Sequence, residues 1–210
     1  MAGNHSVQRQ ARTTELELCR SYSDVLIVDV NGYFVANCVP LLIQQNINGS
    51  SIFNRSWAQF KVGFNDSGGN YWLGNELIHR LTFAFRYKLR FDLQSHNTSN
   101  WYYAEYSSFR VLGEEYHYRL HVDGYSGNAG DAFGSVHHNQ QMFTTYDRDN
   151  DRWAHNCAAW RGGAGFWYGA CDTAQINVSR VGDGVSEYFS WNDLPGGSRL
   201  QTSRMSLQCK

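Results

Sequence analysis

The sequence lacks an excess of charge, a long apolar run and any closely spaced pair of cysteines. Lysine and arginine number 18 and aspartate and glutamate 19, so the net charge is −1 at neutral pH. A chain this close to neutral lacks the basic surface of a nucleic-acid or membrane-surface protein. No apolar run approaches the about 18 residues that a transmembrane helix needs. We therefore expect a soluble globular protein with no nucleic-acid partner and no membrane insertion.

The cysteines are too far apart for a zinc knuckle, which needs pairs separated by two to four residues. Pairing Cys157 with Cys171 would close a loop of about 15 residues and add about 3 kcal/mol of stability. Because the number is odd, we expect one cysteine, the near-terminal one, to be free or to pair with another chain. The five are Cys19, Cys38, Cys157, Cys171 and Cys209.

Six Asn-x-Ser/Thr sequons accompany these cysteines. Each sequon alone is weak evidence, but six beside widely spaced cysteines favour a secreted, extracellular, disulfide-bonded glycoprotein. The first eighteen residues are polar, so we expect a secretory leader to be either removed or absent. The sequons begin at Asn4, Asn48, Asn54, Asn65, Asn97 and Asn177.

Apolar spacing indicates helices and strands in the first 123 residues. Residues 1–18 are polar and predict a tail or a short helical lead-in, and 24–30 predict a buried strand. Trp57, Phe60 and Phe64 recur at spacings of three and four, which indicates one helical face over 54–64. Asn75 predicts the N-cap of a second helix that buries leucine and isoleucine side chains on one face.

The clearest periodicity is the alternation of apolar and polar residues in 87–94 and again in 116–123. The aromatic stretch 101–112 between them is also typical of a strand, so we expect an antiparallel sheet with one solvated face. After residue 123 no strand longer than a few residues is evident, and 12 of the 20 glycines lie there. A glycine-rich segment without periodic apolar residues predicts long ordered loops. The class is α+β.

Three aspartates, Asp147, Asp149 and Asp151, follow one another at a spacing of two. Carboxylates this close repel one another unless a cation such as Ca²⁺ lies among them. The segment is no EF-hand, because its sixth position is Arg152 where that loop needs glycine. An acidic turn balanced by neighbouring arginines explains the pattern equally well.

No enzyme signature is present. The adjacent His137 and His138 have no third ligand nearby, so a surface pair is expected rather than a metal site. The chain has no nucleophile elbow, no phosphate-binding loop and no credible cysteine–histidine dyad. We expect no catalytic residue.

An ordered series of motifs resembles the fibrinogen C-terminal-like (fibrinogen-related) domain found in ficolins, tachylectins, angiopoietins, tenascins and the fibrinogen chains. The resemblance runs from about residue 19 to 207. Its motifs are NRSWAQFKVGF at 54–64, YWLGNELIHRLT at 71–82, YKLRFDL at 87–93, AEYSSFRV at 104–111, YRLHVDGYSGNAGD at 118–131, FTTYDRDND at 143–151 and FWYGAC at 166–171.

The resemblance implies a central twisted antiparallel sheet, short helices and a loop-rich C-terminal lobe that holds calcium and ligand. The domain would span 19–210, with an N-terminal subdomain at about 19–50, the central sheet at 51–112 and the ligand lobe at 113–210. The family order implies disulfides Cys19–Cys38 and Cys157–Cys171, with Cys209 left over.

The resemblance also implies a calcium site just before Cys157. Carried over by position, its ligands are the side chains of Asp149 and Asp151 and the backbone carbonyls of Trp153 and His155. Asp147 then lies outside the set of ligands.

Lectins of this family bind N-acetyl groups in an aromatic funnel beside the calcium. The N–H donors would come from the Ala170–Cys171 peptide, which is often cis in the family. The walls fall on Trp160, Arg161, Tyr188 (or Phe189) and near Leu200. Asp172 stands where the family usually has histidine, which disfavours acidic sugars unless the arginine turns inward to offset the charge.

The resemblance implies a secreted, calcium-dependent, lectin-like pattern-recognition domain that acts in innate immunity and binds N-acetylated glycans. The alternative is a protein-binding ligand domain of the angiopoietin or tenascin type, whose partner is a cell-surface receptor. In either case we expect a homo-oligomer, because family members gain avidity by assembly.

Overall fold

The computed structural model describes residues 40–47, 51–84, 86–178 and 189–210. The chain forms two compact units, Met1–Pro40 with Cys209 and Leu41–Gln208 with Lys210. Apart from Pro40 and Cys209, the described residues all belong to the second unit. The expected tail, the strand at 24–30 and the Cys19–Cys38 pairing lie outside the described residues.

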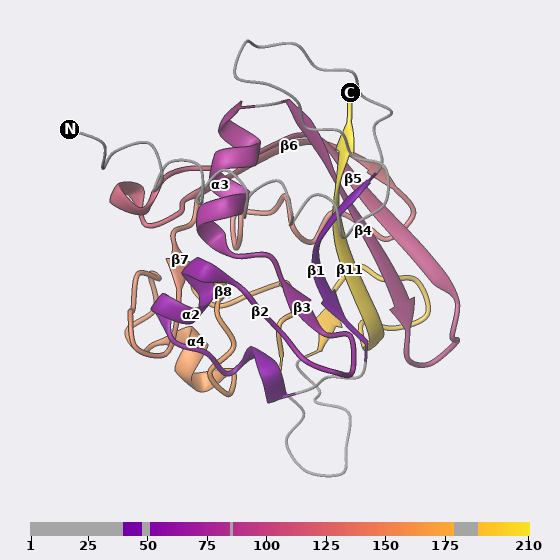
Figure 1. The fold of residues 1–210 in the computed structure, drawn as a ribbon. Coiled ribbons are helices and arrows are strands. Elements are labelled where there is room, and N and C mark those ends of the chain that lie inside the picture. Colours follow the sequence, from indigo (N-terminus) through magenta and orange to yellow (C-terminus); the bar gives the residue numbers. More distant parts are fainter. Residues whose placement is uncertain (1–39, 48–50, 85, 179–188) are drawn as a thin grey trace, which may run out of the picture. The chain divides into compact units, whose positions relative to one another are not determined.

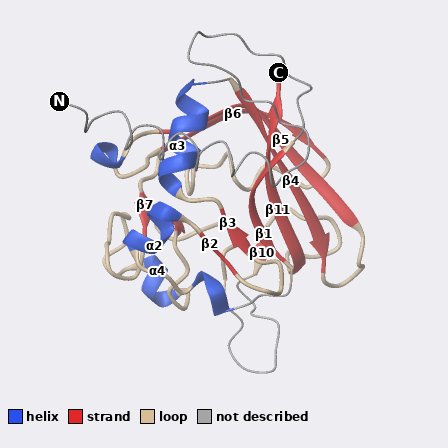
Figure 2. Ribbon diagram, viewed as in Figure 1, coloured by secondary structure: helices blue, strands red, loops and turns tan. Residues whose placement is uncertain are grey.

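Short helices and strands of very unequal length make up this unit (Figures 1 and 2). The helices are η1 (Ser51–Phe53), α2 (Trp57–Val62), α3 (Asn75–Ala84), η2 (Glu114–Tyr116) and α4 (Cys157–Trp160). The strands are β1 (Leu41–Asn46), β2 (Phe64–Asn65), β3 (Tyr71–Trp72), β4 (Tyr87–Ser95), β5 (Trp101–Val111), β6 (Leu120–Gly127), β7 (Phe143–Thr144), β8 (Phe166–Trp167), β9 (Ala174–Gln175), β10 (Ser190–Trp191) and β11 (Leu200–Cys209).

Seven strands form the central sheet in the order β2-β3-β1-β11-β4-β5-β6. The pairs β2–β3, β3–β1, β1–β11, β4–β5 and β5–β6 are antiparallel. The sheet takes β1 from before residue 51 and β6 and β11 from after residue 112, so it is wider than the range expected from the sequence. Figure 1 shows the short elements β7, β8 and α4 grouped to one side of the long strands.

The alternation predicted for 87–94 is confirmed in β4, where Leu89, Phe91 and Leu93 have no exposed surface. The other alternating segment begins later than expected, at Leu120. The residues before it form η2 and a turn in which His117 and Tyr118 adopt left-handed φ angles of 53° and 50°. A strand needs extended backbone, so it cannot start until this turn has ended.

Helix α2 begins with a capping box, in which Ser56 and Gln59 bond each other's backbone N–H groups. Its Trp57 and Phe60 are buried, as their spacing predicts, but the helix ends at Val62, so Phe64 lies in β2 and not on the helical face expected over 54–64. Helix α3 starts at Asn75 itself. It is anchored to β5, because the backbone N–H of Val111 donates to the hydroxyl of Thr82 at 3.1 Å.

Strand β11 corrects the expectation that no long strand follows residue 123. It lies inside the sheet between β1 and β4, with both faces largely covered. Thr202, Ser203 and Ser206 are buried there beside apolar residues, so its sequence shows no alternation of polar and apolar types.

Buried side-chain amides hold the loop-built half to the sheet. Gln44 of β1 donates to the carbonyl of Ile176 and to the side chain of Asn177, each at 3.1 Å. Asn46 donates to the carbonyls of Ile176 and Val178 at 3.0 and 3.2 Å. The buried backbone carbonyls of this loop need hydrogen-bond partners, and these side-chain amides supply them where no neighbouring strand does.

Candidate ligand and calcium site at the Cys157–Cys171 disulfide

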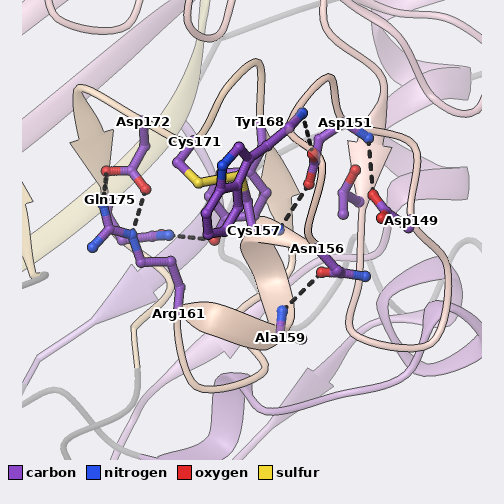
Figure 3. The surroundings of a disulfide bond; sticks show 12 residues. Asp149, Asp151, Asn156, Cys157, Ala159, Arg161, Tyr168, Cys171, Asp172 and Gln175 are labelled. Carbon is purple, nitrogen blue, oxygen red and sulfur yellow. Dashed lines mark hydrogen bonds and ion pairs between the residues drawn. A yellow bond between two sulfur atoms is a disulfide. The ribbon is translucent and has the colours of Figure 1, made fainter.

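The site is built around the disulfide between Cys157 and Cys171, whose Cα atoms are 5.3 Å apart (Figure 3). Cys157 opens α4, and the side chain of Asn156 caps that helix by accepting a hydrogen bond from Ala159 at 2.8 Å. The described residues contain no cis peptide bond, so the cis Ala170–Cys171 peptide implied by the resemblance is absent. The chain turns here through Cys171 itself, which has a left-handed φ of 65°.

Cys209 is also disulfide-bonded. The expectation that it is left over is therefore wrong. Position near the end of a sequence gave no information here, because pairing depends on which thiols meet in the folded chain.

Two of the three closely spaced aspartates converge before the disulfide. The carboxylate of Asp151 accepts the backbone N–H of Trp153 at 2.9 Å and that of Cys157 at 2.8 Å. Asp149 accepts the backbone N–H of Asp151 at 3.3 Å. The third, Asp147, points elsewhere and accepts the N–H of Trp57 at the start of α2 at 2.9 Å.

This arrangement fits a calcium ion. Burial raises the pKa of the Asp151 carboxyl, and the nearby charge of Asp149 raises it further. The hydrogen bonds from the two backbone N–H groups act in the opposite direction and lower it. A cation beside two neighbouring carboxylates favours their charged forms and offsets their mutual repulsion. The backbone carbonyls of Trp153 and His155 accept no hydrogen bond from any described residue. Within the described ranges no three His, Cys, Asp or Glu side chains form a metal-binding group, so half of this donor set would be backbone.

An ion pair fills the space beside the disulfide on its other side. The guanidinium of Arg161 bonds the carboxylate of Asp172 through Nε at 2.8 Å and through a second nitrogen at 3.1 Å. The two side chains are 11% and 5% exposed. Burial raises the pKa of Asp172, while the charge and hydrogen bonds of the arginine act against that rise. The arginine has turned inward.

The exposed ring of Trp160 lies against the arginine of this ion pair. The guanidinium of Arg161 lies 4.2 Å from the centre of the Trp160 ring. That ring is 52% exposed and contacts the ring of Trp153, with centroids 5.3 Å apart.

Of the remaining residues predicted to bind ligand, one is exposed at the surface and the others are buried or outside the described residues. Ala170 is exposed at the surface, whereas Leu200 has no exposed surface. Leu200 is a core residue of β11 and cannot line a pocket wall, and Phe189, the other candidate for the second wall, is 1% exposed. Tyr188 lies outside the described residues.

Comparison with known proteins decides the family. The model of the C-terminal globular domain of fibrinogen beta and gamma chains matches residues 27–210. The chain belongs to the fibrinogen C-terminal domain family. Families with this domain, such as the fibrinogens, the angiopoietin-related proteins and fibroleukin, are non-enzymatic.

The relatives of this fibrinogen-related domain are secreted proteins. Fibroleukin of Bos taurus is 40% identical over 167 residues, which cover 76% of this chain and 37% of the relative. Human angiopoietin-related protein 2 is 40% identical over 166 residues, which cover 75% and 32%. The chain thus spans about a third of the length of these two relatives.

A solved structure agrees with the fold. The fibrinogen-like globe domain of human ANGPTL2 superposes with a TM-score of 0.74 at 32% identity, covering 92% of this chain and 97% of that one. No helix in the described part of this fibrinogen-related domain has the length and apolarity to cross a bilayer.

His138 is a site residue that the sequence did not reveal. The expected surface pair is wrong, because His138 has no exposed surface. Its Nε2 accepts the backbone N–H groups of Thr173 and Ala174 at 3.1 and 2.9 Å, so its Nδ1 carries the proton and donates to the Trp167 carbonyl at 2.8 Å. Burial lowers its pKa to about 4, with His137 adding to the effect. This neutral ring fixes the loop that follows Cys171.

Proposed function

We propose that this chain is a secreted ligand domain that binds a cell-surface protein receptor through the surface around Cys157–Cys171. The observation that carries the proposal is the closed ion pair of Arg161 and Asp172. By the family resemblance, Asp172 stands at the position where a lectin usually has a histidine ring. A site filled by its own side chains binds by its outer surface rather than by enclosing a small ligand.

The outer surface has the composition of a protein-binding site. Trp160 is half exposed, rests on Arg161 and is flanked by the partly buried Trp153. Tryptophan and arginine are enriched among the residues that carry most of the binding energy of protein interfaces. The angiopoietin-related and fibroleukin relatives support this class of function.

The proposal includes one calcium ion held by the side chains of Asp149 and Asp151 and by the carbonyls of Trp153 and His155. It would supply no chemistry to a substrate. It would fix the 149–157 loop and so position the aromatic pair that follows.

The second candidate is an N-acetyl-binding lectin. The exposure of Ala170, the residue before Cys171, favours it, because this peptide would supply the N–H donors to an acetyl carbonyl. We also include assembly into homo-oligomers, which would raise the avidity of either function and is measured by light scattering.

The experiment measures binding of the labelled full chain to animal cells. A protein receptor predicts that brief protease treatment of the cells abolishes binding, while excess N-acetylglucosamine leaves it unchanged. The lectin candidate predicts competition by N-acetylglucosamine and none by glucosamine. Addition of EDTA tests the calcium in the same assay, since chelation should weaken binding under either function.

A further inference from the structure

We propose that Asn65 carries an N-linked glycan in the secreted protein and that Asn177, which heads a similar Asn-x-Ser sequon, does not. The proposal rests on the secretion included in the proposed function. In the transfer, Nδ2 of the asparagine bonds to C1 of a lipid-linked pyrophosphate oligosaccharide. The bond from C1 to the pyrophosphate breaks, the lipid pyrophosphate leaves, and the amide gives up one proton.

The surroundings of Asn65 leave room for a sugar. It lies in β2, which ends the order of described strands in the sheet, and its side chain is exposed. That side chain makes no hydrogen bond with any described residue. The turn that follows is exposed and consists of small residues, Ser67, Gly68 and Gly69 in succession.

The same turn is rigid, so a glycan there would keep a defined position. The carboxylate of Asp66 accepts the backbone N–H and the side-chain amide of Asn70, each at 2.9 Å. Gly69 has a φ of 84°, which favours glycine and keeps the turn bare. A bulky polar sugar beside a terminal strand also hinders pairing with another chain.

Asn177 has the opposite surroundings. It has no exposed surface, its Nδ2 donates to the Gly165 carbonyl at 3.0 Å, and its Oδ1 accepts from Gln44 at 3.1 Å. A sugar on Nδ2 would have to displace both the loop and β1 from a close-packed interior. Because transfer precedes folding, a copy modified at Asn177 could not complete the fold and would not be released.

Two other sequons within the described ranges are exposed but engaged. Nδ2 of Asn97 donates to the Gly196 carbonyl at 3.1 Å. The side chain of Asn54 lies on Gly163, where an added Cβ would come within 2.1 Å of its Oδ1. We therefore expect Asn65 to have the highest occupancy of the four.

The test directs the full chain into the secretory pathway of cultured animal cells with a fused leader. Peptides of the medium and of the cells are then mapped before and after enzymatic release of N-glycans. The expected result is a glycan on Asn65 in most secreted copies and none on Asn177. Asn65→Gln and Ser67→Ala should each lose the Asn65 glycan, and Asn97→Gln should retain it.

Secreted chain with unmodified Asn65, or with a glycan on Asn177, would overturn the proposal. An intact Cys157–Cys171 link in the same map shows that the copies compared are folded. Folded chain that carries the Asn65 glycan but is retained in the cells would support the site choice while contradicting secretion, so the two failures are distinguishable.

Discussion

Replacing Asp172 by asparagine removes the carboxylate that neutralises Arg161 and keeps the side-chain volume. Both side chains are nearly buried, so the arginine would keep its charge at 11% exposure and lose the carboxylate of Asp172 as its counter-ion. Breaking a buried ion pair from one side costs about 3 to 5 kcal/mol, more than the energy of the pair itself, because a desolvated charge remains. We expect Asp172→Asn to lower the free energy of unfolding by about 3 kcal/mol.

Urea unfolding followed by tryptophan fluorescence measures this loss from the shift in midpoint at constant slope. The double variant Arg161→Met with Asp172→Asn should recover much of it, because the methionine stem keeps its contact with Trp160 and no charge is left buried. Arg80→Met is the matched control. It breaks an exposed pair with Glu76, in which the arginine side chain is 62% exposed, and should cost less than about 1 kcal/mol.

Equal losses for Asp172→Asn and Arg80→Met would refute the reasoning, since they would mean that the ion pair is hydrated. A double variant no more stable than Asp172→Asn alone would show that the cost does not come from an uncompensated charge.

Two further predictions concern protons and metal. His138 has a pKa of about 4 in the folded chain against 6.5 when exposed, so its contribution to stability is complete above pH 6.5 and is lost as the pH falls toward 4. The loss reaches about 3 kcal/mol, and urea titrations between pH 7 and 4 should show a shallower decline in His138→Gln but not in His137→Gln. An unchanged slope in His138→Gln would contradict the buried neutral ring. Calcium at a hundredfold excess over its dissociation constant should stabilise the fold by about 2.7 kcal/mol, seen as a rise in Tm. Asp149→Asn with Asp151→Asn should abolish that rise, and an equal rise in this variant would place the ion elsewhere.

Local patterns predicted the parts of the fold that local physics determines. The alternation in 87–94 and the spacing of Trp57 and Phe60 each reflect one buried face of one element, so a short window of sequence contains the signal. Strand β11 was missed because it is covered on both faces and carries hydroxyl side chains inside the sheet.

The site shows the same division. The motif match placed the disulfide pair Cys157 and Cys171, because the match preserves order and spacing. It could not reveal that Arg161 folds over Asp172, or that His138 is buried beneath Thr173. Those contacts join residues 11 and 35 positions apart through a loop with no periodicity. Whether Cys209 forms a disulfide likewise depends on which thiol lies close to it in the folded chain, and its position in the sequence does not give this.

The most direct test of the central claim compares two exposed tryptophans on the same chain. Trp160 and Trp101 are 52% and 46% exposed, and each has an arginine over its ring. Only the first lies beside the disulfide. Truncating a tryptophan at the centre of an interface costs about 2 kcal/mol or more, which is more than a tenfold loss of affinity. We predict that Trp160→Ala weakens binding of the labelled chain to cells by at least about tenfold at unchanged Tm, while Trp101→Ala leaves binding as it was. Equal binding by the two variants, or a loss only in Trp101→Ala, would contradict a receptor surface at the Cys157–Cys171 disulfide.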